Sequence, residues 1–107
     1  MTETKKPAQR LTRKFEVGQC CATPGVLAAL EENGQYPIQF IARHQAGDWG
    51  DLSDGDKELN EQALIPDPTT GECDRILSAY HLKDKTKIYI ITEWDRSKTT
   101  VLLPSEY

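Results

Sequence analysis

The sequence lacks the features that mark membrane-spanning, secreted and disulfide-stabilised proteins. No apolar run approaches the roughly 18 residues that suggest a membrane span, and the N-terminus has no apolar core of a secretory signal. The three cysteines include the adjacent pair Cys20 and Cys21, which makes a poor disulfide framework. We therefore expect reduced thiols and a cytoplasmic protein.

Signatures of familiar metal and catalytic sites are also missing. The cysteines form no C-x2-C pair, and His44 and His81 have no partner at ligand spacing, so we expect no structural zinc. Thr23-Pro24-Gly25 belongs to no G-x-x-x-x-G-K-[ST] loop and is interpreted as an ordinary helix start. No G-x-S-x-G element is present either. We expect no cofactor and assign no catalytic residue.

What the sequence does have is a globular composition with an uneven charge. Its 107 residues, 37% hydrophobic and 28% charged, are enough for one modest core. Residues 47–74 carry nine acidic residues and one basic residue, a net charge of −8, whereas the segments before and after them carry +2 each. An acidic middle repels phosphate, so non-specific nucleic-acid binding is disfavoured.

The N-terminal segment differs from the rest of the chain. Residues 1–12 are polar and basic, and Pro7 discourages a helix, so we predict a flexible basic tail followed by a single domain over residues 13–107. A basic arm that touches an acidic partner is the alternative. The alternation of Phe15, Val17 and Cys21 with polar neighbours then predicts a half-buried strand over residues 15–21. Burial in such a strand would make the two thiols inert.

Three helices are predicted in the first two thirds of the chain. Thr23 and Pro24 form a helix start, and Asn33-Gly34 forms a stop. A second helix runs from Pro37 towards Gly47. Ile38 and Ile41 are stacked on its apolar side with Phe40 beside them, and Arg43 and His44 lie in its last turn. A third begins after Ser53, with a narrow apolar edge of Leu59, Ala63 and Leu64.

The last third predicts three strands. Residues 75–82, 87–94 and 99–103 alternate or are rich in β-branched residues, and short polar turns join them. Short connections favour an antiparallel meander, with Ile88, Ile90 and Ile91 among the least exposed residues. Together with the N-terminal strand this predicts an α+β domain, with about three helices packed on one face of a mostly antiparallel sheet.

Three stretches of the chain resemble a family of short bacterial proteins found on plasmids, prophages and integrative elements. The stretches are ATPGVLAAL at residues 22–30, ARHQAGDWGDL at residues 42–52 and IYIITEWDRSKTTVLLP at residues 88–104. Such proteins are often labelled plasmid-related or, loosely, subunits of type I restriction enzymes. This chain is too short for a restriction methyltransferase subunit and lacks its Asn-Pro-Pro-aromatic element. The resemblance implies a bacterial cytosolic protein associated with mobile DNA, and no catalytic residue.

The segment 43–52 concentrates reactive groups around Asp48 and Trp49, which Gly47 and Gly50 bracket. The backbone is expected to turn sharply there and to need a positive φ at one or both glycines. The candidate binding rim consists of Arg43, His44, Asp48, Trp49, Asp51, Glu93, Asp95 and Arg96. The structural alternative is that Arg43 and His44 cap a helix, Asp48 binds backbone amides, Asp51 pairs with Arg43, and Trp49 plugs the junction of helices and sheet.

Two functions of different classes fit this segment. The first is a non-catalytic binding or regulatory module that acts through a protein partner, which could be a nucleic-acid-handling protein with a basic surface. The second is a small metal-dependent phosphoesterase or nuclease, in which His44 is the base, Asp48 and Asp51 bind the metal, and Arg43 clamps phosphate. Glu93, Asp95 and Arg96 would complete that site.

Overall fold

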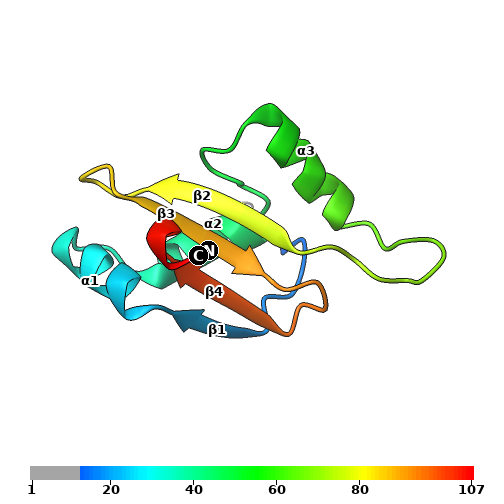
Figure 1. Ribbon diagram of the computed structural model, residues 1–107, viewed down its shortest axis with the longest axis horizontal. Coiled ribbons are helices and arrows are strands. Elements are labelled where there is room, and N and C mark those ends of the chain that lie inside the picture. Colours follow the sequence, from blue (N-terminus) through cyan, green and yellow to red (C-terminus); the bar gives the residue numbers. More distant parts are fainter. Residues whose placement is uncertain (1–12) are drawn as a thin grey trace, which may run out of the picture.

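A four-stranded sheet with the order β1-β4-β3-β2 forms the centre of the molecule, and the helices pack against it (Figure 1). The computed structural model describes residues 13–107, so the predicted tail over residues 1–12 lies outside the described residues. The elements are β1 (Gln19–Ala22), α1 (Pro24–Glu32), α2 (Pro37–Gln45), α3 (Asp54–Ala63), β2 (Ile76–His81), β3 (Lys87–Thr92), β4 (Lys98–Leu102) and the 3-10 helix η3 (Pro104–Glu106). This is the predicted α+β fold. None of the helices in this described part is long and apolar enough to cross a membrane.

The C-terminal strands form the predicted antiparallel meander. β2 pairs with β3, and β3 pairs with β4, both in the antiparallel sense. β1 lies on the far side of β4 and runs parallel to it, with Gln19 opposite Lys98 and Ala22 opposite Val101. The sheet therefore has β1 at one edge and β2 at the other, and only the β1–β4 pair departs from the antiparallel pattern.

One face of the sheet, which we call the core face, carries the main hydrophobic core under α1 and α2. Ile88 and Ile90 are fully buried and Ile91 is 6% exposed, which confirms their predicted burial. The main cluster consists of Val26, Leu30, Phe40, Ile41, Tyr80, Leu82, Ile88, Ile90 and Val101.

Replacing Ile90 with alanine is expected to lower the free energy of unfolding by about 2 to 5 kcal/mol, because the truncation leaves a cavity in a packed core. Equilibrium unfolding in urea measures this loss. Ile38→Ala serves as the control, since Ile38 is 67% exposed and its replacement should change stability by no more than about 0.5 kcal/mol. Equal effects of the two changes would contradict the central position of β3.

β1 is shorter than predicted. It begins at Gln19 because Gly18 adopts a φ of +62°, which turns the chain, and a side chain at Gly18 would overlap the Ser97 carbonyl. Phe15 leaves the sheet and packs in a second cluster at its border. Cys20 and Cys21 alternate along β1 and so point to opposite faces, but both are exposed. The expectation that burial makes these thiols inert is therefore wrong.

The first two helices begin and end near their predicted positions. The Oγ1 atom of Thr23 accepts a hydrogen bond from the Val26 N–H (3.3 Å), which satisfies one free amide at the start of α1. Asn33 ends α1, and α2 starts at Pro37.

The buried side of α2 differs from the prediction. Phe40, Ile41 and His44 are buried, whereas Ile38 is exposed. Phe40 and His44 are four residues apart and therefore lie on one side of the helix. The helix is thus rotated about its axis relative to the predicted orientation, and this rotation carries His44 into the core.

α3 lies along the edge of β2 (Figure 1). The Asn60 side chain pairs with the strand backbone: the Leu77 N–H donates to Oδ1 (3.1 Å), and Nδ2 donates to the Leu77 carbonyl (2.6 Å). Asn60 thereby takes the place of a neighbouring strand at this edge. Ala63 is buried beside Ile76, but Leu59 is 61% exposed, so the predicted apolar edge through Leu59 is wrong.

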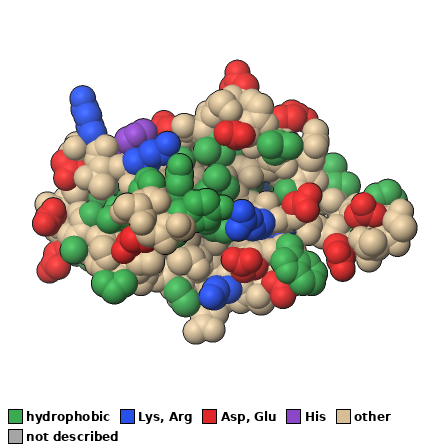
Figure 2. All heavy atoms as spheres, in the orientation of Figure 1, with side chains coloured by type: hydrophobic (Ala, Val, Ile, Leu, Met, Phe, Trp, Pro, Cys, Tyr) green, Lys and Arg blue, Asp and Glu red, His purple; other side chains and the backbone are tan. Residues whose placement is uncertain are grey.

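The opposite face of the sheet, which we call the open face, carries Leu77, Tyr89 and Ile91. η3 lies in front of it (Figure 1), and the Tyr107 ring packs edge-on against Tyr89, with 6.0 Å between the ring centroids. Figure 2 shows hydrophobic side chains gathered near the middle of this face. Residues 13–107 thus cover the open face less completely than the core face.

Candidate functional site

Residues 43–52 turn sharply beside β2. Gly47 (φ +87°) and Gly50 (φ +77°) both have the predicted positive φ. The Asp51 N–H donates to the Ala79 carbonyl (2.7 Å), and the Ala79 N–H donates to the Trp49 carbonyl (3.2 Å). A side chain at Gly50 would overlap that same Ala79 carbonyl. Close approach to β2 therefore requires glycine at this position.

Trp49 is a scaffold residue. Its side chain is 4% exposed, stacks on Phe15 with 6.1 Å between ring centroids, and donates from Nε1 to Glu61 Oε2 (2.8 Å). Ala63 and Ile76 complete this cluster. The alternative that Trp49 plugs the junction of helices and sheet is confirmed, and its indole lies beneath the surface rather than on the rim.

Arg43 and Asp48 form an exposed ion pair above this cluster. Arg43 Nε donates to Asp48 Oδ2 (2.7 Å), and the guanidinium lies 4.5 Å from the centre of the Tyr80 ring. Asp48 Oδ1 accepts from the Gly50 N–H (3.2 Å), as the structural alternative predicted. The bond from Arg43 holds the pKa of the Asp48 carboxyl below its ordinary value. The carboxylate is thus committed to charge pairing and turn formation.

Asp51 pairs with His81, which was not among the residues predicted at the rim. Its Oδ2 atom lies 2.8 Å from His81 Nδ1, and both side chains are about half exposed. The expected pairing of Asp51 with Arg43 is therefore wrong. His81 comes from the open-face side of β2. Alternation along residues 76–82 indicates this face, but no signal in the sequence places the turn beside it.

His44 is not on the rim at all. Its side chain is fully buried and lies between Ser78, whose Oγ is 2.6 Å from Nδ1, and Thr92, whose Oγ1 is 2.8 Å from Nε2. Phe15 covers the ring edge-on at 5.1 Å. The prediction that His44 lies at the surface is wrong, because the observed orientation of α2 about its axis turns this residue into the core.

The hydrogen bonds around His44 determine its tautomer. Thr99 Oγ1 donates to the Val17 carbonyl (2.8 Å), so its oxygen must accept from Thr92 Oγ1 (2.6 Å). Thr92 has then used its hydrogen and accepts from His44 Nε2–H. In a neutral ring Nδ1 is the acceptor, and Ser78 donates to it. Every member of this buried chain is satisfied, which suits a structural role.

Burial keeps this imidazole neutral. Loss of solvation, with a smaller contribution from the positive charge of Arg96, lowers the pKa of His44 to about 3. A general base works best with a pKa near the operating pH and within reach of its substrate. His44 meets neither condition, so it does not support the phosphoesterase alternative.

The remaining rim residues lie at the other end of β2 and β3. In the antiparallel pair, Thr92 is opposite Ile76 while Lys87 is opposite His81, so the turn after β3 is far from the Asp51–His81 pair. Arg96 is a structural clamp there: Nη2 donates to the Ala63 carbonyl (2.9 Å) at the end of α3, and Nη1 donates to the Asp74 carbonyl (2.6 Å).

Glu93 and Asp95 belong to the same turn as Arg96. The Glu93 carbonyl accepts from Arg96 Nη1 (3.1 Å). Asp95 Oδ1 accepts from the Ser97 hydroxyl (2.7 Å) and from the Ser97 N–H (3.0 Å), and these two bonds lower the pKa of the Asp95 carboxyl. The predicted rim is therefore two separate groups, and only Arg43, Asp48 and Asp51, joined by His81, lie together at the surface.

A metal centre has no ligand set within residues 13–107. No three His, Cys, Asp or Glu side chains in that part of the chain converge on one point. Comparisons of the chain with protein-family models, with curated protein sequences and with solved structures found no match.

Replacing Arg43 with alanine is expected to lower the free energy of unfolding by no more than about 1 kcal/mol, because an exposed ion pair and an exposed cation–π contact each contribute little. The Arg43 and Asp48 side chains are 45% and 50% exposed. Urea unfolding of Arg43→Ala beside Asp48→Asn checks this value. A loss above about 2 kcal/mol would mean that the pair is part of the scaffold.

Proposed function

We propose that this chain is a non-catalytic binding module, associated with bacterial mobile DNA, that acts through a protein partner with a basic surface. The observation that carries the proposal is the surface of α3. Asp54, Asp56 and Glu58 are exposed on this helix, and Leu59 is 61% exposed among them. An exposed leucine beside carboxylates offers an apolar anchor inside a charged frame, which is the general composition of a protein-binding patch.

A groove beside Leu59 supports the same proposal. It has a volume of about 210 Å³ and lies between α3 and β2. Its lining residues are Leu52, Asp56, Leu59, Asn60, Arg75 and Leu77. Leu52 directly follows Asp51, so the surface group of Arg43, Asp48, Asp51 and His81 continues into this groove. The predicted rim and the α3 surface would then form one contact area.

Charge selects the kind of partner. Acidic side chains gather over α3 and the loop that follows it (Figure 2), in the segment of net charge −8. Complementary charge speeds association and suppresses wrong partners. A protein that handles nucleic acid presents basic surface of this kind, and the resemblance to proteins of mobile elements agrees with such a partner. The chain would then mimic or mask the nucleic-acid backbone rather than bind it.

The test is affinity capture from a bacterial host with two matched double variants. The first, Glu58→Lys with Leu59→Ala, changes the α3 surface. The second, Glu72→Lys with Ile65→Ala, makes the same types of change in the exposed loop that follows α3. Thermal melting confirms that both variants fold. We expect the wild type and the loop variant to retain a basic protein that the α3 variant binds about tenfold more weakly.

Two results would overturn the proposal. Capture of no protein above the level of a tag-only control would remove the case for a binding module. Equal retention by both variants would leave the module in place but would remove its assignment to α3. Salt provides a further check, because binding through complementary charge should weaken as ionic strength rises.

A further inference from the structure

The outer edge of β1 is a strand edge without a neighbour in the described chain. The Gln19 N–H donates to the Ser97 carbonyl (3.0 Å) and the Thr23 N–H donates to the Val101 carbonyl (3.0 Å), so the odd-numbered residues of β1 face β4. By alternation, the backbone N–H and C=O groups of Cys20 and Ala22 point away from the sheet. No element described over residues 13–107 lies beyond them (Figure 1).

The opposite edge of the sheet is treated differently. At β2 the side chain of Asn60 pairs with Leu77, and the backbone of residues 49–51 pairs with Ala79. Natural proteins cover or blunt strand edges because a free edge pairs with other chains. β1 carries no charged side chain and no proline over Gln19–Ala22. The described part of the chain therefore blocks one edge of its sheet and leaves the other without a neighbour.

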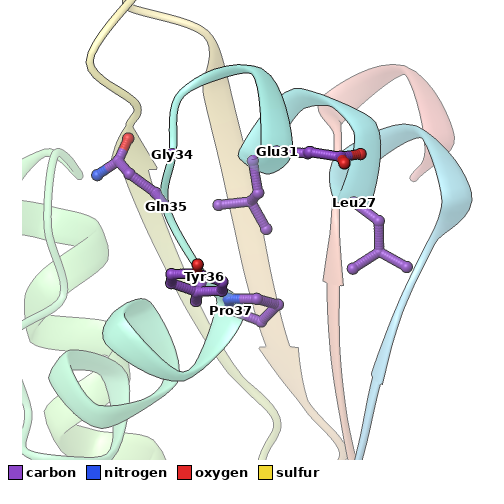
Figure 3. Close-up of a pocket in the computed structure, with 7 residues that line it drawn as sticks. Leu27, Glu31, Gly34, Gln35, Tyr36 and Pro37 are labelled. Atoms are coloured by element: carbon purple, nitrogen blue, oxygen red, sulfur yellow. The ribbon is translucent and has the colours of Figure 1, made fainter.

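An apolar groove lies beside α1, the helix that directly follows β1. Its volume is about 370 Å³, and it lies between α1 and the start of α2 (Figure 3). Leu27, Leu30, Tyr36 and Pro37 supply its apolar walls. Leu27 lies one helical turn after Thr23, the residue that joins β1 to α1, and its N–H donates to the Thr23 carbonyl (3.0 Å). Leu27 and Tyr36 are 46% and 67% exposed.

We propose that the β1 edge and this groove together form a docking site for an extended segment of a partner protein. The segment adds a strand beside β1, with main-chain hydrogen bonds to Cys20 and Ala22. Every second side chain of an added strand points to the core-face side, where α1, α2 and the groove lie. A large apolar side chain at such a position fills the groove, which gives the site its specificity.

Charge and side-chain size identify the occupant. Glu31 is the one charged residue among those that line the groove, so the segment carries a Lys or Arg near its apolar anchor. A second copy of this chain fits poorly, because β1 offers only the small side chains of Cys20 and Ala22 on its core-face side. Such side chains leave the groove empty. The occupant is therefore a basic and apolar strand from another protein.

The probe is a phage-displayed library of random peptides of about twelve residues, selected on the immobilised full-length protein. An enriched peptide is then synthesised, and its dissociation constant is measured by fluorescence polarisation. We expect enriched sequences to alternate apolar and polar residues and to contain Lys or Arg. In the complex, the Cys20 and Ala22 amides should exchange hydrogen more slowly than in the free protein, while the Cys21 amide, already bonded within the sheet, changes little.

Matched variants separate the strand edge from the groove. Cys20→Pro removes one outward N–H at a position where an edge strand accepts proline, and Cys20→Ala removes only the thiol. We expect the first to weaken the peptide about tenfold and the second to leave its affinity within about twofold. Leu27→Lys should also lower the affinity for the peptide, whereas Leu59→Lys on the α3 surface should leave it unchanged. A failure of this proposal can therefore be distinguished from a failure of the proposed α3 binding surface.

Four outcomes would overturn the proposal. These are no enriched peptide, equal binding to Cys20→Pro and Cys20→Ala, enriched peptides with apolar residues at helical spacing, and unchanged exchange of the Cys20 and Ala22 amides. Light scattering gives a fifth. A dimer of the wild-type chain that Cys20→Pro dissociates would show that a second copy occupies the edge.

Discussion

Replacing Trp49 with alanine is expected to lower the free energy of unfolding by about 3 to 5 kcal/mol, the usual cost of truncating a buried aromatic side chain. The indole is 4% exposed and holds Phe15, Ala63 and Ile76 together in the second hydrophobic cluster. Its loss also leaves the Glu61 carboxylate without the N–H that it accepts. Urea unfolding followed by circular dichroism measures the change without depending on tryptophan fluorescence.

Two further variants make this result interpretable. Trp94→Ala removes the other tryptophan, which is 51% exposed, and should change stability by no more than about 0.5 kcal/mol. Trp49→Phe keeps an aromatic ring and should cost less than Trp49→Ala. If Trp49→Ala and Trp94→Ala had equal effects, the junction of α3, the turn and the sheet would not be the second core of the molecule.

Lowering the pH from about 6.5 towards 4.5 is expected to destabilise the protein by up to about 1.4 kcal/mol per pH unit through His44 alone. Its pKa is lowered from 6.5 in an ordinary setting to about 3 in the fold. Between these values the unfolded chain binds a proton that the folded chain does not bind. The stabilisation is therefore complete above pH 6.5 and is lost as the pH falls towards 3.

The carboxyl groups with lowered pKa contribute in a separate window. Asp48 and Glu106 start from ordinary values of 3.8 and 4.5, so their contribution falls at more acidic pH. Unfolding free energies measured from pH 7.5 to 5 thus isolate the histidine. His44→Leu should remove the dependence of the unfolding free energy on pH in this range. The control Ile90→Val keeps His44, so it should lose about 1 kcal/mol of stability and retain the pH dependence. A slope that persists in His44→Leu would show that another group is responsible.

Local patterns predicted most of the elements. Thr23-Pro24 and Ser53 begin helices in the structure as their capping chemistry requires. The apolar runs of β3 and β4 and the polar turns between them gave the meander. Each of these signals involves residues only a few positions apart, so it can be recognised in a single sequence.

Pairings between distant segments could not be predicted in this way. Alternation along β1 indicates which residues share a face, but it carries no information on the strand beside it or on its direction. The role of Asn60 was hidden for a similar reason, because a polar residue within an acidic helix gives no sign that its amide meets the edge of β2.

The candidate site was predicted in composition but not in geometry. Arg43, Asp48 and Asp51 do lie at one surface, since a short turn keeps them close. His44 was assigned to that surface because it lies in the last turn of the helix, where a cation suits the negative end of the helix dipole. The predicted apolar side of α2 already included Phe40 and Ile41, and the choice of His44 in place of Ile38 would have placed the histidine inside.

The parallel pairing of β1 with β4 also has a consequence for synthesis on the ribosome. Gln19 lies opposite Lys98, so the first strand meets its neighbour only after nearly all of the described chain has left the exit tunnel. Until then Val26 and Leu30 of α1 lack Val101, the β4 residue of the core cluster, and remain more available to chaperones. Contacts this distant in sequence slow folding. A nascent chain arrested before Lys98 should therefore remain sensitive to protease, and resistance should appear only once β4 has emerged.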